Sequence, residues 1–142
     1  GIYDHIVFAP HHPLMRGFDE TYRAPHSRHT GVLQEDINKV PELMILSVSR
    51  LAGVHIIANK NGRQFFLTGH SEYDRDTLAK EYIRDVKKGL DPEIPYHYFP
   101  NDDPMATPPF VWRSGASLLF SNWLNYYVYQ QTPYDLKDLD FI

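Results

Sequence analysis

The fold is decided by residues 64–90, which read QFFLTGHSEYDRDTLAKEYIRDVKKGL. Residues 64–68 are expected to form a strand. Apolar residues then recur every four positions between residues 75 and 90, which predicts an amphipathic helix with Asp74 as its N-cap and Gly89 at its end. A strand that runs through Gly-His-Ser-Glu into a helix is typical of an α/β sheet, whose active sites lie at the carboxyl ends of strands.

The remaining elements are predicted by hydrophobic runs and turn residues. Strands or short extended runs are expected at 5–8, 18–24, 43–48 and 54–58. The Asn-Gly pair at 61–62 predicts that the strand before it turns back on the strand at 64–68, so at least part of the sheet is antiparallel. Helices are also expected at 34–40 and at 114–131, and a Pro-rich loop at 91–109. The helix at 114–131 is apolar and aromatic over much of its surface, so we expect it to be largely buried.

Composition and charge exclude several classes of function. Of the 142 residues, 42% are hydrophobic and 23% are charged, as in an ordinary globular domain with a core. The formal net charge of −4 argues against a nucleic-acid-binding surface, which needs clustered positive charge. No run approaches the roughly 20 apolar residues that span a bilayer. We therefore expect a cytoplasmic protein that binds neither nucleic acid nor membrane, and the absence of cysteine excludes disulfides.

The start of the chain is unusual. Gly1 leads at once into the mainly apolar segment at residues 2–8, whereas natural termini are usually polar and frayed. Two interpretations are open from the residues alone: a chain cut within a domain, or a complete domain preceded by a glycine left from a tag.

His70 and Glu72 are the first candidates for catalysis. In an extended segment, residues i and i+2 point to the same side, so Glu72 is expected beside the imidazole of His70. A carboxylate in that place holds the histidine tautomer and stabilises the imidazolium, as in a nucleophile–histidine–acid triad. The alternative interpretation is a surface histidine beside a glutamate that caps the following helix.

Five motifs together resemble those of the homoserine O-succinyltransferase/O-acetyltransferase family. They occur in the family's order with matching spacing, and they cover essentially the whole chain. The motifs are APHHPL (9–14), APHSR (24–28), FLTGHSEYD (66–74) with EYIRD (81–85), PYHYFPNDDP (95–104) and SNWLNYYVYQQTP (121–133).

The resemblance implies a fold and a mechanism. The family has a flavodoxin-like α/β fold similar to class I glutamine amidotransferases, with helices on both faces of the sheet and a Cys–His–Glu triad. A cysteine thiolate takes the acyl group from acetyl-CoA or succinyl-CoA and passes it to the hydroxyl of L-homoserine in a ping-pong cycle. This reaction is the entry step to methionine biosynthesis. Acyl-CoA is a co-substrate, and no cofactor or metal is implied.

The resemblance also assigns roles to residues of this chain. His70 matches the family's general base and Glu72 its orienting carboxylate. Ser27 and Arg84 match residues that contact the substrate, and the planar guanidinium of Arg84 suits the carboxylate of an amino acid. Glu81 lies on the same helix face as Arg84. It is expected to hold Arg84, to meet the ammonium of the substrate, or to be a solvated helix charge.

The chain departs from the family because it contains no cysteine. The resemblance therefore implies that residues 1–142 are the C-terminal half of a single acyltransferase catalytic domain, inactive alone, whose partner is the missing N-terminal half; a homodimer is also expected. Three alternatives stay open: an acyltransferase for serine or another hydroxy amino acid, a different amidotransferase-like enzyme, and a non-catalytic amino-acid-binding domain. The choice between acetyl and succinyl donors is open as well.

Two further groups of side chains have less specific interpretations. One consists of possible metal ligands, namely His11, His12, His26 and His29. A zinc site needs about four converging donors, so structural or surface roles are favoured for these histidines. The other is an aromatic helix face formed by Trp123, Tyr126, Tyr127 and Tyr129. Its helical spacing and the negative net charge favour a core or oligomer contact over the stacking of bases.

Overall fold

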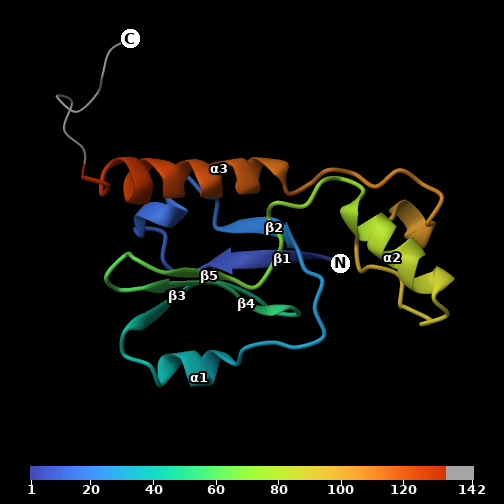
Figure 1. Cartoon of the computed structure of the whole chain (residues 1–142), viewed down its shortest axis with the longest axis horizontal. Coiled ribbons are helices and arrows are strands. Elements are labelled where there is room, and N and C mark those ends of the chain that lie inside the picture. The colour runs from blue at the N-terminus through green and yellow to red at the C-terminus, as the bar shows by residue number, and fades with distance from the viewer. Residues whose placement is uncertain (134–142) are drawn as a thin grey trace, which may run out of the picture.

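The computed structural model describes residues 1–133 of the chain. Its centre is one five-stranded sheet with the strand order β2-β1-β3-β4-β5 (Figure 1). The strands are β1 (Ile2–Val7), β2 (Thr21–Pro25), β3 (Leu43–Ser49), β4 (Gly53–Asn59) and β5 (Phe65–Leu67). Each predicted extended run therefore overlaps a strand, with ends that differ by a few residues.

The strand pairings within residues 1–133 are all antiparallel. The β4–β5 hairpin confirms the turn predicted at the Asn-Gly pair, where Gly62 has a φ of 71°. The α/β class is confirmed as well. Because this part of the chain contains no parallel pair, the flavodoxin-like arrangement stays a prediction.

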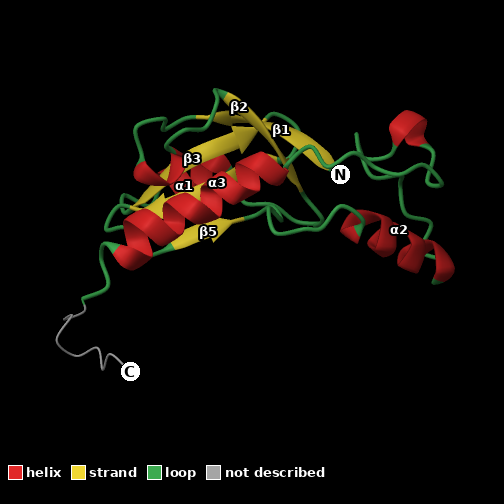
Figure 2. Cartoon of the chain, turned by 90° about the horizontal axis from the view of Figure 1, so that it is seen from above, coloured by secondary structure: helices red, strands yellow, loops and turns green. Residues whose placement is uncertain are grey.

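Helices cover both faces of the sheet and extend the molecule beyond one end of it. α1 (Gln34–Asn38) and α3 (Arg113–Trp123) lie on opposite faces (Figure 1). α2 (Thr77–Lys87) lies past the end of the sheet (Figure 2). None of the helices in the described part of the chain is long and apolar enough to cross a membrane.

Two clusters of buried side chains hold these elements in place around the site. The first packs α3 on the sheet and contains Leu14, Met15, Leu46, Ile56, Ala58 and Leu119. The second lies at the start of β1 and α2 and contains Ile2, Leu78, Tyr98, Phe99 and Trp112. The second cluster positions the segment that enters α2, because the Trp112 indole donates to the carbonyl oxygen of Tyr73 (3.0 Å) and the Tyr98 hydroxyl donates to that of Arg75 (2.5 Å).

The helix predicted at 75–90 is shorter than expected. α2 begins at Thr77, so its cap position is Asp76 rather than Asp74. The carbonyl oxygen of Asp74 instead accepts from Thr77 N (3.2 Å) in a turn that precedes the helix. Gly89, with a φ of 72°, ends the helix as predicted, because a left-handed conformation after the last turn favours glycine.

The prediction that the helix at 114–131 is largely buried is wrong. α3 is followed by a π-helical segment, Leu124–Tyr129, and in α3 only Leu119 and Asn122 are buried. The exposed large residues of this stretch are Phe120, Trp123, Leu124 and Tyr129. A single sheet face covers only one stripe of the helix, so the apolar residues on its other sides remain at the surface of this chain.

Candidate active site

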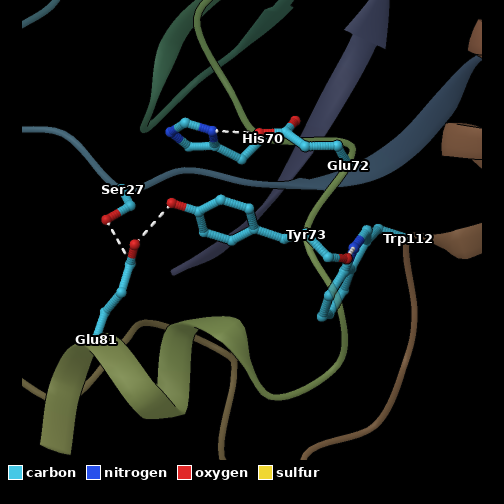
Figure 3. Close-up of polar contacts among 6 residues, drawn as sticks. All are labelled: Ser27, His70, Glu72, Tyr73, Glu81 and Trp112. Atoms are coloured by element: carbon cyan, nitrogen blue, oxygen red, sulfur yellow. Dashed lines mark hydrogen bonds and ion pairs between the residues drawn. The ribbon is translucent and has the colours of Figure 1, made fainter.

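His70 and Glu72 form a hydrogen-bonded pair just beyond the end of β5. His70 Nδ1 lies 2.8 Å from Glu72 Oε1, and both side chains are partly exposed (Figure 3). The contact predicted from the i, i+2 spacing is present, but the backbone there is not extended. Residues 71–72 form a turn closed by Tyr73 N, which donates to the carbonyl oxygen of His70 (3.2 Å), and this turn brings the two side chains together. With the Nδ1 proton donated to the carboxylate, Nε2 is the nitrogen left to exchange protons with a reactant.

The loop that carries His70 lies flat against neighbouring strands. His70 N donates to the carbonyl oxygen of Pro25 at the end of β2 (2.8 Å). A Cβ at Gly69 would stand 2.8 Å from that same oxygen, 2.8 Å from His26 Nε2 and 2.9 Å from His55 Nε2. There is therefore no room for a side chain at residue 69. The close contact of Gly69 with Pro25, His26 and His55 fixes the position of His70 relative to the sheet.

A second group of side chains joins the end of β2 to α2. Ser27 Oγ donates to Glu81 Oε2 (2.8 Å), and the Tyr73 hydroxyl donates to Glu81 Oε1 (2.8 Å). The Tyr73 ring also stacks on His70, with ring centroids 4.3 Å apart and planes at 15°. Tyr73 thus connects the His70–Glu72 pair with Ser27 and Glu81 (Figure 3).

Sequence reasoning does not identify Tyr73. No periodic spacing pairs it with Glu81, which lies eight residues later on a separate element. The available signal is its place within the FLTGHSEYD motif, directly after Glu72, a candidate catalytic carboxylate. Burial, together with the hydrogen bond to Glu81, raises the pKa of Tyr73 to about 12. Its hydroxyl therefore stays protonated near neutral pH and acts as the donor.

Arg84 is not brought into this group. Its guanidinium pairs with Asp85, with Nε 2.7 Å from Oδ1 and Nη2 3.1 Å from Oδ2. A cleft of about 670 Å³ is lined by Ser27 and Glu81, but by neither His70 nor Arg84. The resemblance groups Arg84 with Ser27 as residues that contact the substrate, but Arg84 does not line this cleft beside Ser27. The adjacent carboxylate of Asp85 captures the exposed guanidinium, and Glu81 does not hold it.

Three buried imidazoles lie against the loop that carries His70. They are His5 on β1, His26 after β2 and His55 on β4, and their ligating atoms lie within 4.8 Å of one another. His5 Nε2 is 2.9 Å from His26 Nε2, and Arg28 Nε donates to His26 Nδ1 (3.3 Å). Burial is the main reason that the pKa of His5 falls to about 4 and that of His26 to about 3; it also lowers the pKa of His55.

The hydrogen bonds of this histidine cluster assign its tautomers and argue against a metal ion. Because Arg28 donates to Nδ1 of His26, the proton of that ring lies on Nε2 and is donated to His5 Nε2. A metal between the three rings would need Nε2 of His26 without its proton. The group also offers no carboxylate to offset the charge of a metal beside Arg28. The cluster is therefore a neutral part of the core that is only partly hydrogen-bonded, because His5 Nδ1 and His55 Nε2 have no partner among the described residues.

The histidines proposed from the sequence as possible metal ligands do not come together. Only His26 belongs to the buried cluster, and the other two members, His5 and His55, come from separate strands. His12 Nδ1 accepts from the backbone N of Leu14 (3.2 Å) and caps a short 3-10 turn. Proximity along the chain is a poor guide here, because the strand order places β1 between β2 and β3.

Comparison with known proteins adds a family match. Residues 1–134 match the model of a family described as homoserine O-succinyltransferase. A homoserine O-acetyltransferase of Petrotoga mobilis is 57% identical over 140 residues, which are 99% of this chain and 45% of that protein. Homoserine O-acetyltransferases of Geobacillus kaustophilus (59% over 135 residues, 95% and 45%) and Acetivibrio thermocellus (58% over 139 residues, 98% and 46%) are similar to it as well. The chain spans less than half the length of these relatives.

Proposed function

This chain belongs to the homoserine O-succinyltransferase family, and we propose that it is the C-terminal half of a single acyltransferase catalytic domain. In our proposal the complete protein transfers an acetyl or succinyl group from acyl-CoA to the hydroxyl of L-homoserine. The observation that carries the proposal is the His70–Glu72 pair, joined at 2.8 Å in a motif shared with this family. The names of the relatives, which are homoserine O-acetyltransferases, support the same reaction.

The proposed reaction has two steps that share one histidine. A cysteine thiolate from the rest of the protein attacks the thioester carbonyl of acyl-CoA, the bond to the CoA sulfur breaks, and CoA leaves as a thiol with a proton from His70. The homoserine hydroxyl then gives its proton to Nε2 of His70 and attacks the acyl carbonyl, and the cysteine thiolate is released. Glu72 holds the ring and stabilises its imidazolium form in both steps.

Ser27, Glu81 and Arg84 form the acceptor side of the proposed site. The carboxylate of Glu81 offers the negative charge that an amino-acid ammonium needs. Arg84 offers a planar guanidinium for the substrate carboxylate, provided that it leaves Asp85. Both residues are on α2, on the same side of the helix, so one small amino acid is able to span them.

The proposed complete fold is flavodoxin-like. β5 is an edge strand of the sheet described here, and its partly exposed Phe66 and Leu67 line one apolar hollow with Phe120 and Trp123 of α3. An open apolar edge favours pairing with a further strand. We propose that the remainder of the protein supplies that strand and, with it, the parallel part of the sheet.

The proposal is tested with the full-length protein that contains this chain. Incubation with acetyl-CoA or succinyl-CoA is expected to add one acyl group, detected by mass spectrometry, and L-homoserine is expected to discharge it. His70→Ala should lower turnover by roughly 10²–10⁴-fold, because the general base is lost. Glu72→Gln should keep the fold and lose a large part of the rate. A wild-type protein that is neither acylated nor able to acylate homoserine contradicts the proposal.

A further inference from the structure

Tyr73 makes two different contacts with two different parts of its side chain. The ring stacks on the imidazole of His70 at 4.3 Å, while the hydroxyl donates to Glu81 Oε1 at 2.8 Å. The ring therefore faces the proton-transferring side of the proposed site, and the hydroxyl faces the acceptor side (Figure 3). Because the two contacts use different atoms, a substitution can remove one and keep the other.

The backbone of Tyr73 is held from both directions, so its side chain starts from a fixed point. Its carbonyl oxygen accepts from Trp112 Nε1 (3.0 Å), and its N–H donates to the carbonyl oxygen of His70 (3.2 Å). Trp112 is 1% exposed and belongs to the buried cluster that anchors α2. A tyrosine whose backbone is fixed to the core in this way is able to orient the partly exposed side chains that it contacts, His70 and Glu81.

The carboxylate of Glu81 depends on Tyr73 for its orientation. One of its oxygens accepts from Tyr73 and the other from Ser27, so the two donors fix its plane. Glu81 lies on α2 and Ser27 follows β2, so the three residues come from three separate segments. Loss of the tyrosine hydroxyl would leave Glu81 with one donor, and both Glu81 and Ser27 would be free to turn.

We propose that Tyr73 is a positioning residue with two separable tasks, an inference that rests on the proposed acyltransferase function. Its ring orients the imidazole of His70 for acyl transfer from the donor. Its hydroxyl orients Glu81, and through it Ser27, for binding an α-amino acid that carries a side-chain hydroxyl. The ring is thus needed in both half-reactions, whereas the hydroxyl is needed only when the acceptor binds.

Two substitutions in the full-length enzyme separate these tasks. Tyr73→Phe keeps the stacked ring, so the rate of acyl labelling by acyl-CoA should stay within about twofold of wild type. The KM for L-homoserine in the discharge step should rise at least about 10-fold, the usual effect of losing a hydrogen bond to a charged group. Tyr73→Leu removes both contacts, so acyl labelling should slow at least about 10-fold as well.

Matched variants exclude a general loss of stability. Tyr126→Phe removes a hydroxyl that is also hydrogen-bonded, to Arg16 Nη1 (2.8 Å), and should leave both half-reactions unchanged. Glu81→Gln weakens the same contact from the other side, and combining it with Tyr73→Phe should add little to the larger single defect. If Tyr73→Leu does not fold, Tyr73→Phe and this double-variant comparison decide the question.

The outcomes distinguish this inference from the proposed function. A wild-type enzyme that does not transfer acyl groups overturns both. If wild type is active, equal slowing of the two steps in Tyr73→Phe overturns the division of tasks, and an unchanged homoserine KM overturns the role of the hydroxyl. Wild-type acyl labelling in a folded Tyr73→Leu enzyme overturns the role of the ring.

Discussion

Among the proposed site residues, Arg84 stands out because the structure pairs it with Asp85, whereas its proposed role is to bind the carboxylate of the substrate. Its ion pair with Asp85 is exposed, and such surface pairs contribute little to stability, because water screens both charges. The guanidinium is therefore free to exchange Asp85 for another carboxylate without strain in the fold. An amino-acid carboxylate that arrives beside Glu81 is a suitable replacement partner.

Substitution of Arg84 tests this exchange. In the full-length enzyme, Arg84→Lys should leave acyl labelling by acyl-CoA unchanged, because that step needs no contact with the acceptor. Discharge by homoserine should require about 100-fold more substrate, since an ammonium cannot form the bidentate contact. The two steps are measured separately by mass spectrometry of the acyl-enzyme. Equal losses in both, together with lower thermal stability, would show that Arg84 acts only as a structural partner of Asp85.

The loop between β5 and α2 is the element on which the site depends. It carries His70 and Glu72, and it approaches β2 so closely at Gly69 that backbone, not side chain, forms the contact. The backbone of Pro25 cannot move aside, and the rings of His26 and His55 are buried. A change in the height of this loop would therefore move His70 away from Ser27 and Glu81.

Gly69→Ala tests whether the close approach of this loop to β2 is needed for activity. The added methyl group should displace residues 68–70, lower acyl transfer at least about 100-fold and reduce the free energy of unfolding by about 1–3 kcal/mol, as overpacking does. Gly115→Ala is the matched control, because a Cβ there meets Phe18 and Tyr22 at an ordinary 3.6 Å in the first turn of α3. Full activity in Gly69→Ala would show that the close approach is not required.

The histidine cluster brings together β1, the end of β2 and β4 beneath the loop that carries His70. Burial holds the pKa values of His5 and His26 at about 4 and about 3, below their ordinary 6.5. An unfolded chain therefore takes up protons between about pH 6.5 and pH 4 that the folded chain does not. The stabilising effect is complete above about pH 6.5 and is lost as the pH falls toward 4.

Acid should thus destabilise the fold through these rings. The free energy of unfolding, measured in urea at pH 7.5, 6 and 5, should fall by roughly 1 kcal/mol per pH unit for each buried histidine. His55→Leu should remove the contribution of one histidine, so the free energy of unfolding should change less steeply with pH than in wild type. His97→Asn is the control, because His97 is exposed and its φ of 50° suits asparagine, so the slope should not change. An equal slope in wild type and His55→Leu contradicts the role of the cluster.

Local features of the fold and site were accessible from the sequence because they depend on neighbours along the chain. The hairpin follows from Asn61-Gly62. The His70–Glu72 contact joins residues two positions apart as expected, although a turn at residues 71–72, and not an extended segment, brings them together. The extent of α2 was predicted to within a few residues, but its cap was not, because tertiary hydrogen bonds to Arg75 and Tyr73 place the preceding turn.

By itself, the sequence determined the α/β class and the family, and it indicated His70 and Glu72 as the pair that we propose for proton transfer. Only the tertiary structure decided that Tyr73 bridges to Glu81, that the buried histidines are His5, His26 and His55, and that Arg84 pairs with Asp85. The physical reason is the sequence separation of the residues in contact. Spacing along the chain governs contacts within a turn or a strand, whereas strand order and core packing govern which distant side chains meet.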